Sequence, residues 1–457
     1  MTANLAARLR NVLPAARLID DPALVAAQAT DASRRPAPRA ALVVRPRNAE
    51  EVSAVLRVAH ATTTPVVPQG ARTGLVGAAA AIEGCILLDL SEMDAILDID
   101  AAEGTAVVQP GVVVADLQRA ARARGLFYAP DPASAEWATV GGTIATNAGG
   151  MRCIRYGVTG DAVLSLQIVL ADGSIERTRP ATVKGVAGLD LTSLVVGSEG
   201  TLAVVTEATL RLLPAPGPAR GVVGLFPSTG AALAAAAEVT IGERLPATLE
   251  FLDDTALRGI RLVRPDLDLD PSARSWLLAV TDAREGAGRD LDRFSDAFTA
   301  HGALSVDRAE DEEQLDRLLA ARRALNPGLL ALRGDATHGD LAVPRSRLTV
   351  FAEEAERIAR ESGVEISLAG HVGDGNLHPT VVYDGADPVE TEKAHRAAAD
   401  LLRLAQHLGG TVAGEHGIGT LKLGDLDGEL SRRLRGLQRE IKRVFDPRGI
   451  LNPGRKL

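Results

Sequence analysis

Two short histidine-containing segments near the end of the chain carry the side chains best suited to chemistry. Residues 370–378 read GHVGDGNLH, and residues 414–417 read GEHG. His371 and His378 are seven residues apart, and the three glycines of their segment and the proline that follows rule out a helix. A straight strand would point them to opposite faces, so we expect a turn between them that lets both imidazoles converge.

These segments contain a ligand set that is typical of metal sites. His371, His378 and Glu415 form a two-histidine, one-carboxylate group with room for a further ligand, as in catalytic sites for Zn²⁺ and similar divalent ions. His416 follows Glu415 and is a candidate general base, because an imidazole titrates near neutral pH. The alternative is hydrogen-bonded histidines in glycine-rich loops. We favour the metal site because three of only eight histidines gather here.

Three glycine clusters in the first half of the chain predict a second kind of site. They read QGARTGLVG at 69–77, GGTIATNAGG at 141–150 and GSEGT at 197–201. Glycine lets the backbone approach a ligand closely, and a concave row of N–H groups binds phosphate. The alternative is three tight turns. The chain has neither GxGxxG after its first strand nor a P-loop motif, so we expect a large phosphate-bearing cofactor held differently from a Rossmann dinucleotide.

The elements that must position these residues begin with a β-α-β unit. Apolar spacing predicts strands at 42–44 and 65–68 around a helix at 50–60. Residues 1–30 read as largely helical, and the Pro-rich stretch at 214–218 marks a domain boundary. Further strands are expected at 86–88, 106–108, 166–170, 194–196, 203–213, 249–251 and 276–280, with a strand end at 342–344, and further helices at 229–239, 286–301, 311–324, 346–362 and 430–445. The side chains expected to face inward from the last helix are Leu434, Leu437, Ile441 and Val444.

Composition excludes several classes of protein. The chain has 50 basic and 59 acidic residues in 457, and this net charge of −9 argues against a general binder of nucleic acid or anionic membrane. With 46% hydrophobic and 24% charged residues it is ordinary for a globular protein. Two cysteines are too few for an iron–sulfur cluster or a disulfide framework of its own.

The targeting and membrane signals point to a protein without a membrane span. No apolar run approaches the ~18 residues that a spanning helix needs. The N-terminus carries Arg8 and Arg10 but no apolar core of a secretory signal, so we expect a surface helix there rather than a transit peptide. The expected location is cytoplasmic, with peripheral membrane association as an alternative.

Seven motifs together resemble a known family. They are VVPQGARTGLVG (66–77), VGGTIATNAGGMRCIRYG (140–157), IVLADG (168–173), VGSEGTLAVVTE (196–207), GHVGDGNLH (370–378), GEHGIG (414–419) and DPRGILNPG (446–454). Their types and order resemble the FAD-dependent D-2-hydroxyacid dehydrogenases, such as D-2-hydroxyglutarate and D-lactate dehydrogenases, within the vanillyl-alcohol oxidase and p-cresol methylhydroxylase superfamily. The resemblance covers nearly the whole chain.

The resemblance implies an α+β fold with three parts. Residues 1–217 would form a two-lobed FAD-binding domain of the p-cresol methylhydroxylase type, with an N-terminal helix in 1–30 and a pyrophosphate loop at 68–77. Residues 218–420 would form an α+β cap domain with an antiparallel sheet and the metal site. Residues 421–457 would pack back on the FAD domain.

It also implies a role for each matching residue. His371, His378 and Glu415 correspond to the ligands of a divalent metal, zinc or manganese, and His416 corresponds to the base. Substrate-binding positions are Arg322, His338 and Thr380. The absence of histidine from the pyrophosphate loop implies non-covalent FAD. The FAD-binding positions are Pro68, Gln69, Gly70, Ala71, Arg72, Thr73, Gly74, Leu75, Pro130, Ser134, Val140, Gly141, Gly142, Thr143, Thr146, Asn147, Gly149, Gly150, Gly157, Gly200, Thr201, Val204 and Asn452.

The implied activity is the oxidation of a D-2-hydroxy acid to the 2-oxo acid, with hydride passing from C2 to flavin N5. The chain departs from the family at Ala71-Arg72, where Gly-Asn is common, at a lysine missing before Asp340, and at Thr380 in place of asparagine. The last two changes touch the substrate pocket and argue against 2-hydroxyglutarate, whose distal carboxylate needs cations.

The implied partners are a small 2-hydroxy acid and an external electron acceptor, which would be a quinone, an electron-transfer flavoprotein or a cytochrome. A homodimer is a compatible assembly. No nucleic acid is expected as a partner. One alternative is a glycolate oxidase-type flavoprotein subunit that works with an iron–sulfur partner. The alternative of another class is a flavin-free metal-dependent hydrolase that uses the His/Glu site.

Overall fold

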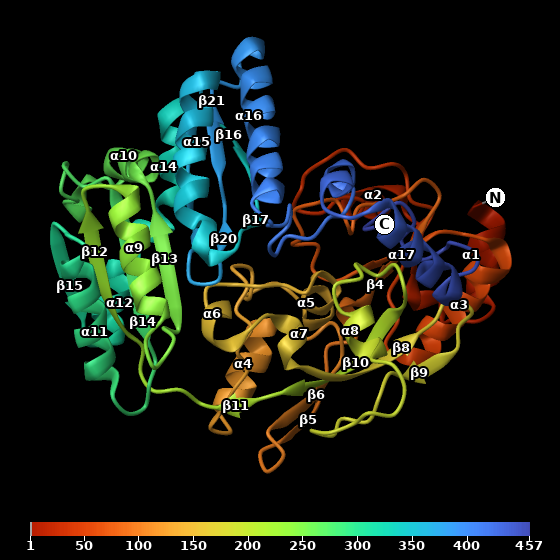
Figure 1. Ribbon diagram of the computed structural model, residues 1–457. Coiled ribbons are helices and arrows are strands. Elements are labelled where there is room, and N and C mark those ends of the chain that lie inside the picture. Colours follow the sequence, from red (N-terminus) through yellow and green to blue (C-terminus); the bar gives the residue numbers. More distant parts are fainter. Residues whose placement is uncertain (1) are drawn as a thin grey trace. The chain divides into compact units, whose positions relative to one another are not determined.

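The computed structural model describes residues 2–457 and divides into two compact units (Figure 1). Unit 1 comprises the residues up to Gly150, Gly157–Ala215 and Glu415–Leu457, and unit 2 comprises Met151–Tyr156 and Pro216–Gly414. Both units combine helices with β-sheets, which confirms the α+β class. None of the described helices has the length and apolar character needed to cross a membrane.

The first sheet of unit 1 is the predicted β-α-β unit. Strands β2 (Leu42–Val44), β4 (Ile86–Asp89) and β3 (Val66–Gln69) are parallel, and β1 (Leu18–Ile19) adds an antiparallel edge. Helix α3 (Ala49–Thr62) connects β2 to β3 and begins at the cap residue Asn48, whose side chain accepts from Glu51 N. The strands are buried on both faces, as expected for parallel strands beneath helices.

The second sheet of unit 1 is antiparallel. Its strand order is β5-β6-β10-β8-β9, and its buried residues pack with those of helices α4 and α5. A two-stranded pair, β7 with β11, completes the strands of this unit. The bounds are β5 (Ile96–Asp100), β6 (Thr105–Val108), β7 (Leu126–Phe127), β8 (Val163–Val169), β9 (Ile175–Arg177), β10 (Val204–Arg211), β11 (Leu213–Pro214), α1 (Thr2–Arg10), α2 (Pro22–Ala27), α4 (Val114–Arg122), α5 (Val140–Thr146), α7 (Thr159–Ala162), α8 (Leu191–Val195) and α17 (Arg432–Phe445).

Unit 2 is built on a seven-stranded antiparallel sheet, in the order β15-β12-β14-β13-β19-β20-β17. Alternate side chains of its central strands enter two cores, one with α9, α11, α15 and α16 and one with α10, α12, α13 and α14. A three-stranded sheet, β16-β21-β18, lies in the same unit. The strand bounds are β12 (Arg220–Phe226), β13 (Thr248–Leu252), β14 (Ser275–Thr281), β15 (Ser305–Ala309), β16 (Asp335–His338), β17 (Leu341–Ala342), β18 (Glu365–Ser367), β19 (Ala369–His371), β20 (Asn376–Leu377) and β21 (Thr380–Tyr383).

Helices of unit 2 surround these sheets, and the long α15 and α16 are prominent in Figure 1. Both contribute alanine-rich faces to the larger core, which allows close packing on the strands. The helix bounds are α6 (Cys153–Tyr156), α9 (Thr229–Thr240), α10 (Asp254–Val263), α11 (Ala287–Ala300), α12 (Glu312–Leu318), α13 (Ala320–Arg323), α14 (Leu325–Arg333), α15 (Leu348–Ser362) and α16 (Pro388–His407).

The structure corrects three expectations about elements. The helical reading of 1–30 is wrong in its middle, where the chain after Pro14 forms a 3-10 turn and β1 before α2. The strand expected at 194–196 is instead the end of α8, which begins at the side-chain cap of Asp190. The single helix expected at 311–324 divides into α12 and α13 at Leu319.

The inward face of α17 also differs from the expected one. Leu434, Leu437 and Val444 are exposed, with 80% of Val444 accessible. The helix instead turns Lys442 inward, where its ammonium donates to Thr201 O and Leu451 O at 2.6 and 2.7 Å. The helix thus faces the protein with the part-buried Lys442 and with Phe445, which packs against the core of the second sheet, and the apolar spacing did not indicate this face.

Candidate cofactor and catalytic site

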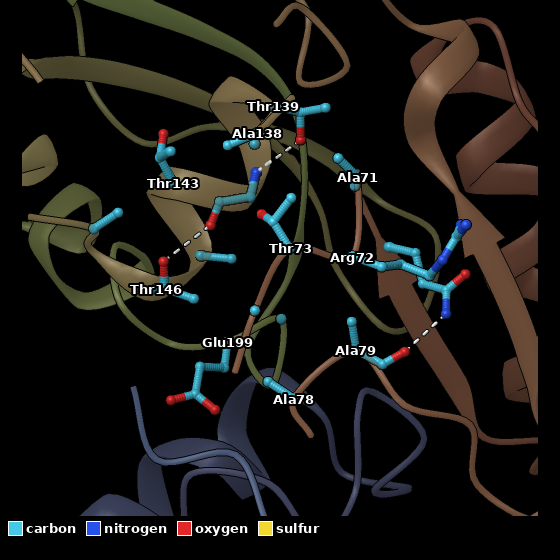
Figure 2. A pocket seen from close by; sticks show the side chains of 18 of the residues that line it. Ala71, Arg72, Thr73, Ala78, Ala79, Ala138, Thr139, Thr143, Thr146 and Glu199 are labelled. Atoms are coloured by element: carbon cyan, nitrogen blue, oxygen red, sulfur yellow. Dashed lines mark hydrogen bonds between the residues drawn. The ribbon is translucent and has the colours of Figure 1, made fainter. Parts of the chain in front are cut away.

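Unit 1 contains a cavity of about 400 Å³ where its three glycine clusters meet. The loop after β3, the helix α5 and the turn before β10 line it, and Figure 2 shows their side chains around a common space. Most of the lining residues are small, so the main chain forms much of the wall. This volume lies within the range typical of ligand pockets.

The loop after β3 presents main-chain donors without protein acceptors. Among the described residues, the N–H groups of residues 71–78 donate no hydrogen bond, whereas Ala79 N donates to Asp31 Oδ2 at 3.3 Å. Gln69 anchors the start of the loop, because its Nε2 donates to Gln28 O and Ala79 O at 3.0 and 2.7 Å. Its Oε1 is buried without a partner. Such a row of donors fits an anionic phosphate group.

Arg72 adds a positive charge to the same loop. Its backbone is left-handed, with a φ of 57°, and it is the second residue of the row of donors. The guanidinium forms no ion pair or hydrogen bond with another described residue, and the residue lines the cavity. A phosphate bound by the loop would supply the missing counter-charge.

Helix α5 forms the opposite wall but does not offer free donors at its start. Its first N–H groups are already paired: Val140 N with Val112 O, Gly141 N with Pro110 O, and Gly142 N with the cap oxygen of Thr139. The glycines here allow close packing. A Cβ at Gly141 would lie 2.5 Å from Pro110 Cβ, and one at Gly70 would lie 2.2 Å from Thr139 Oγ1.

The cavity brings together most of the predicted FAD-binding positions. The ones that line it are Pro68, Gln69, Gly70, Ala71, Arg72, Thr73, Gly74, Leu75, Ser134, Gly141, Gly142, Thr143, Thr146, Gly149, Gly200 and Val204. The ones that do not are Pro130, Val140, Asn147, Gly150, Gly157, Thr201 and Asn452. Asn452 instead supports two residues that line the cavity, because its Nδ2 donates to Ala78 O and Glu199 O at 3.0 and 2.7 Å.

Glu415 and His416 line this same cavity. They lie in a segment without helix or strand, and Glu415 Oε1 is 3.8 Å from His416 Nε2. About a quarter of the His416 side chain is exposed, so the imidazole is accessible to a small ligand. The predicted base therefore faces the space that the glycine-rich loops surround.

Unit 2 brings His371 and His378 together through a hairpin. The strands β19 and β20 pair with Gly370 opposite Leu377 and His371 opposite Asn376, and His378 N donates to Ala369 O at 2.7 Å. This register puts both histidines on one face as diagonal neighbours, as the expected turn requires. Their Nε2 atoms are 3.5 Å apart, and their rings are nearly perpendicular.

Glu250 is a buried partner of this pair that the sequence did not indicate. It lies on β13 directly opposite His371, and Glu250 Oε1 is 2.5 Å from His371 Nδ1. Its other oxygen accepts from Arg322 Nε at 3.0 Å. Burial opposes ionisation, but the charges of His371 and Arg322 outweigh it and hold the pKa of Glu250 below its usual range. A charged residue inside the apolar stretch 248–252 was the signal that could have revealed it.

The remaining predicted positions also lie in unit 2. His338 pairs with Thr380 across β16 and β21, and its Nδ1 is 3.2 Å from Thr380 Oγ1. Asp340 Oδ1 accepts from Asn376 Nδ2 at 3.3 Å and lies 4.0 Å from His378 Nδ1. Gly414 packs against these two residues, since a Cβ there would lie 2.0 Å from Asn376 Nδ2. The chain passes from unit 2 to unit 1 at the next residue, Glu415.

The histidine pair has the geometry of half a metal site. Two nitrogens bound to one tetrahedral Zn²⁺ are about 3.4 Å apart, given Zn–N distances near 2.05 Å. The 3.5 Å between the Nε2 atoms fits this value. The carboxylate at His371 Nδ1 supplies the outer partner that metal-binding histidines usually have. The residues present therefore suit a divalent cation.

Comparison with solved structures defines the class of protein. The fold matches p-cresol methylhydroxylase with substrate bound at a TM-score of 0.78, 17% identity, and coverage of 99% of this chain and 96% of that one. This likeness confirms the p-cresol methylhydroxylase type of flavoprotein fold. At this identity it concerns the fold alone.

Comparison by sequence defines the family. The model for an FAD binding domain matches residues 40–179, and the model for the C-terminal domain of FAD-linked oxidases matches residues 216–455. The glycolate oxidase subunit GlcD of Bacillus subtilis (strain 168) is 40% identical over 417 residues, which cover 90% of this chain and 88% of the relative. A D-lactate dehydrogenase of Archaeoglobus fulgidus is 39% identical over 424 residues, 92% of each chain.

The chain therefore belongs to the FAD-linked oxidases, and it is an FAD-linked oxidoreductase of the glycolate oxidase subunit and D-lactate dehydrogenase type. The family resemblance read from the motifs is confirmed. The flavin-free hydrolase is set aside, because both parts of the chain match flavoprotein domains.

A first prediction concerns the wall between the β3 loop and α5. Replacing Gly70 with Ala should raise the dissociation constant for FAD by about 10- to 100-fold, because the added methyl must displace Thr139 and overpacking costs about 1–3 kcal/mol. FAD titration of the apoprotein, followed by flavin fluorescence, measures this. The same change at Gly436, where a Cβ meets nothing within 4 Å, is the control. Equal affinities for the two variants would contradict the prediction.

Proposed function

We propose that the protein oxidises a small D-2-hydroxy acid to the 2-oxo acid with FAD as its cofactor. The observation that carries the proposal is that Glu415 and His416 line the same cavity as residues 71–75 and 78, whose main-chain N–H groups donate to no described residue. A proton acceptor and a cradle for a phosphate-bearing cofactor thus share one space. The names of the relatives support the substrate class, because glycolate and D-lactate are both small 2-hydroxy carboxylates.

Different residues of the cavity are proposed to bind different parts of FAD. The donors of residues 71–78 and the guanidinium of Arg72 suit the pyrophosphate, and the close-packed glycines of α5 keep that wall flat. The position of Glu415 and His416 in the lining supports the hypothesis that the flavin ring of the cofactor lies beside them. The flavin, when bound, supplies the acceptor for the hydride that leaves C2.

His416 is the proposed base. Oxidation of an alcohol carbon releases a proton from the hydroxyl and a hydride from C2, so a proton acceptor beside the hydroxyl is required. The partly exposed imidazole lies 3.8 Å from the Glu415 carboxylate. Glu415 and His416 therefore act as neighbours with separate tasks.

His371, His378 and Glu415 are the proposed ligands of a divalent metal, zinc or manganese. The hairpin supplies the two imidazoles at a suitable separation, and Glu250 orients His371 so that its Nε2 faces His378. The metal would lower the pKa of the substrate hydroxyl and orient the carboxylate. Glu415 follows Gly414, which packs beside Asp340 and Asn376 in the unit of the histidines.

Arg322, His338 and Thr380 are the proposed substrate contacts. Arg322 uses Nε for Glu250, so its two terminal nitrogens remain for a carboxylate in bidentate geometry. His338 and Thr380 form a polar pair without the fixed positive charge of a lysine, which a longer dicarboxylate substrate would need. This pairing favours an acid of the size of lactate or glycolate over 2-hydroxyglutarate.

A second candidate function is a flavoprotein subunit of a glycolate oxidase complex. The subunit name of the B. subtilis relative favours it. In either case the reduced flavin needs an external electron acceptor, which would be a quinone, an electron-transfer flavoprotein, a cytochrome or an iron–sulfur partner. Co-purification with an iron–sulfur protein distinguishes the second candidate from the first.

The substrate class is tested by anaerobic reduction of the bound flavin. D-lactate or glycolate should bleach it, with D-lactate at least about tenfold faster than L-lactate, because carboxylate and hydroxyl contacts together present only one face of C2. Stopped-flow absorbance measures the rates. D-2-hydroxyglutarate should be slower than D-lactate. Failure of every 2-hydroxy acid, or equal rates for the two lactates, would reject the proposal.

Replacing His416 with Ala should slow flavin reduction by about 10²- to 10⁴-fold, because the reaction loses its general base. FAD content should stay at the wild-type level, since the phosphate cradle is untouched. The exposed His407, at the end of α16, provides the matched His-to-Ala control. A His416→Ala variant that is bleached as fast as the control would remove His416 from this role.

Removal of the metal should abolish turnover while the protein keeps its flavin. Dialysis against a chelator is expected to lower the rate of flavin reduction at least about 100-fold, because the substrate hydroxyl keeps its high pKa. Zn²⁺ or Mn²⁺ should restore the rate in the wild type but not in His371→Ala. Full activity in excess chelator, with no metal found by elemental analysis, would refute the metal.

A further inference from the structure

Glu199 is a buried carboxylate in the wall of the FAD cavity, and none of the functions above uses it. Its side chain is fully buried, and it lies in the turn between α8 and β10. Glu199 Oε1 accepts from Ile418 N, and Oε2 accepts from Gly419 N, both at 2.8 Å. Figure 2 shows this carboxylate directed toward the C-terminal segment of the chain. Both oxygens therefore bind the main chain that directly follows His416.

The segment after His416 is irregular and glycine-rich. Residues 415–419 form no helix or strand, and Gly417 and Gly419 adopt φ values of 85° and 51°. A Cβ at Gly417 would lie 2.9 Å from Glu199 Oε1, and one at Gly419 would lie 2.1 Å from Val76 O. The two glycines let this chain approach Glu199 and the β3 loop closely, and the carboxylate supplies the hydrogen bonds.

The same residue connects the segment to the C-terminal tail. Asn452 Nδ2 donates to Glu199 O at 2.7 Å, and Lys456 Nζ lies 3.6 Å from Glu199 Oε1. Lys456 N also donates to Gly419 O at 3.3 Å. All of these residues belong to unit 1. Glu199 thus lies at the centre of a closed group of contacts that borders the cavity.

The two adjacent N–H donors match the two oxygens of a carboxylate, since each oxygen accepts from one of them. An ionised carboxylate can accept at both oxygens, whereas an amide has one acceptor and would turn its NH₂ group toward the second N–H. A neutral glutamine is nearly the same size, so it tests the two bonds without changing the volume. An aspartate keeps the charge but is one methylene shorter.

We propose that Glu199 is a positioning residue for His416: it holds residues 417–419 through two main-chain hydrogen bonds and so fixes the imidazole against the cavity. It touches the segment that carries the base and has no part in the transfer of the proton or hydride. The expected effect of Glu199 on the reaction rate rests on the proposed role of His416. Its expected effect on the main chain of residues 417–419 does not depend on that role.

The first test measures amide hydrogen exchange in the FAD-loaded protein. Glu199→Gln should speed exchange at Ile418 and Gly419 by about tenfold or more, because one bond is lost and an N–H faces an NH₂ group. The control is Glu207→Gln, on β10, where the glutamate pairs with Arg177 away from the cavity lining. Unchanged exchange at both amides would overturn the proposal, whatever the rates.

The second test is a double-mutant cycle on the rate of anaerobic flavin reduction by D-lactate. Glu199→Gln should lower this rate by about 10- to 100-fold with FAD content unchanged, since a displaced catalytic group costs this much. In the His416→Ala background the same change should alter the rate by less than about twofold. Full additivity of the two losses would overturn positioning, because a purely structural effect would persist without the imidazole.

A third variant keeps the proposal testable if the Glu199→Gln protein does not fold. Glu199→Asp keeps the charge and should give smaller losses in both measurements, and wild-type values in a folded Glu199→Asp protein would also overturn the proposal. The experiments can reject the role of His416 as the base and the role of Glu199 as a positioning residue independently of each other. A wild-type rate in His416→Ala rejects the base, whereas wild-type exchange in Glu199→Gln rejects the positioning residue.

Discussion

The site depends on a run of main-chain N–H groups that the protein itself leaves unpaired. Polar groups at a cavity wall need a partner, and the N–H groups of residues 71–78 have no acceptor among the described residues, although several of the carbonyls of this loop are hydrogen-bonded. The constraint reaches beyond the loop. Gln69 must fix its start, Asn452 must hold Ala78, and Gly70 must lack a side chain so that Thr139 can cap α5. An anionic cofactor completes this arrangement, which explains why the cavity wall is mainly backbone.

The histidine pair follows from a different constraint, the register of one hairpin. An odd spacing of seven residues would separate His371 and His378 on a straight strand. Pairing Gly370 with Leu377 turns the same spacing into a diagonal contact on one face. The turn and its pairing therefore create the ligand geometry, and a shift of the register by one residue would reverse the face of one histidine.

The features that could be predicted from the sequence are those that residues close together in the chain determine. The glycine clusters, the turn between the histidines and the short strands around α3 depend on residues close together in the chain, and they are readable for that reason. Glu199 and Glu250 escaped notice because their roles come from partners 219 and 121 residues away. The face of α17 escaped for the same reason, since Lys442 is satisfied by Thr201 O, far outside the helix. Apolar periodicity carries no information about such contacts.

Two buried glutamates, Glu250 and Glu199, each hold two other groups in place through hydrogen bonds. Glu250 uses its oxygens for two side chains, so the orientation of His371 and that of Arg322 depend on one carboxylate. Glu199 uses its oxygens for two main-chain amides, so the course of the chain after His416 depends on another. Both side chains are fully buried, where a carboxylate is costly unless its oxygens are hydrogen-bonded. Replacement of either carboxylate would therefore release two groups at once, which links the side chains of the hairpin to Arg322 and the chain after His416 to the turn before β10.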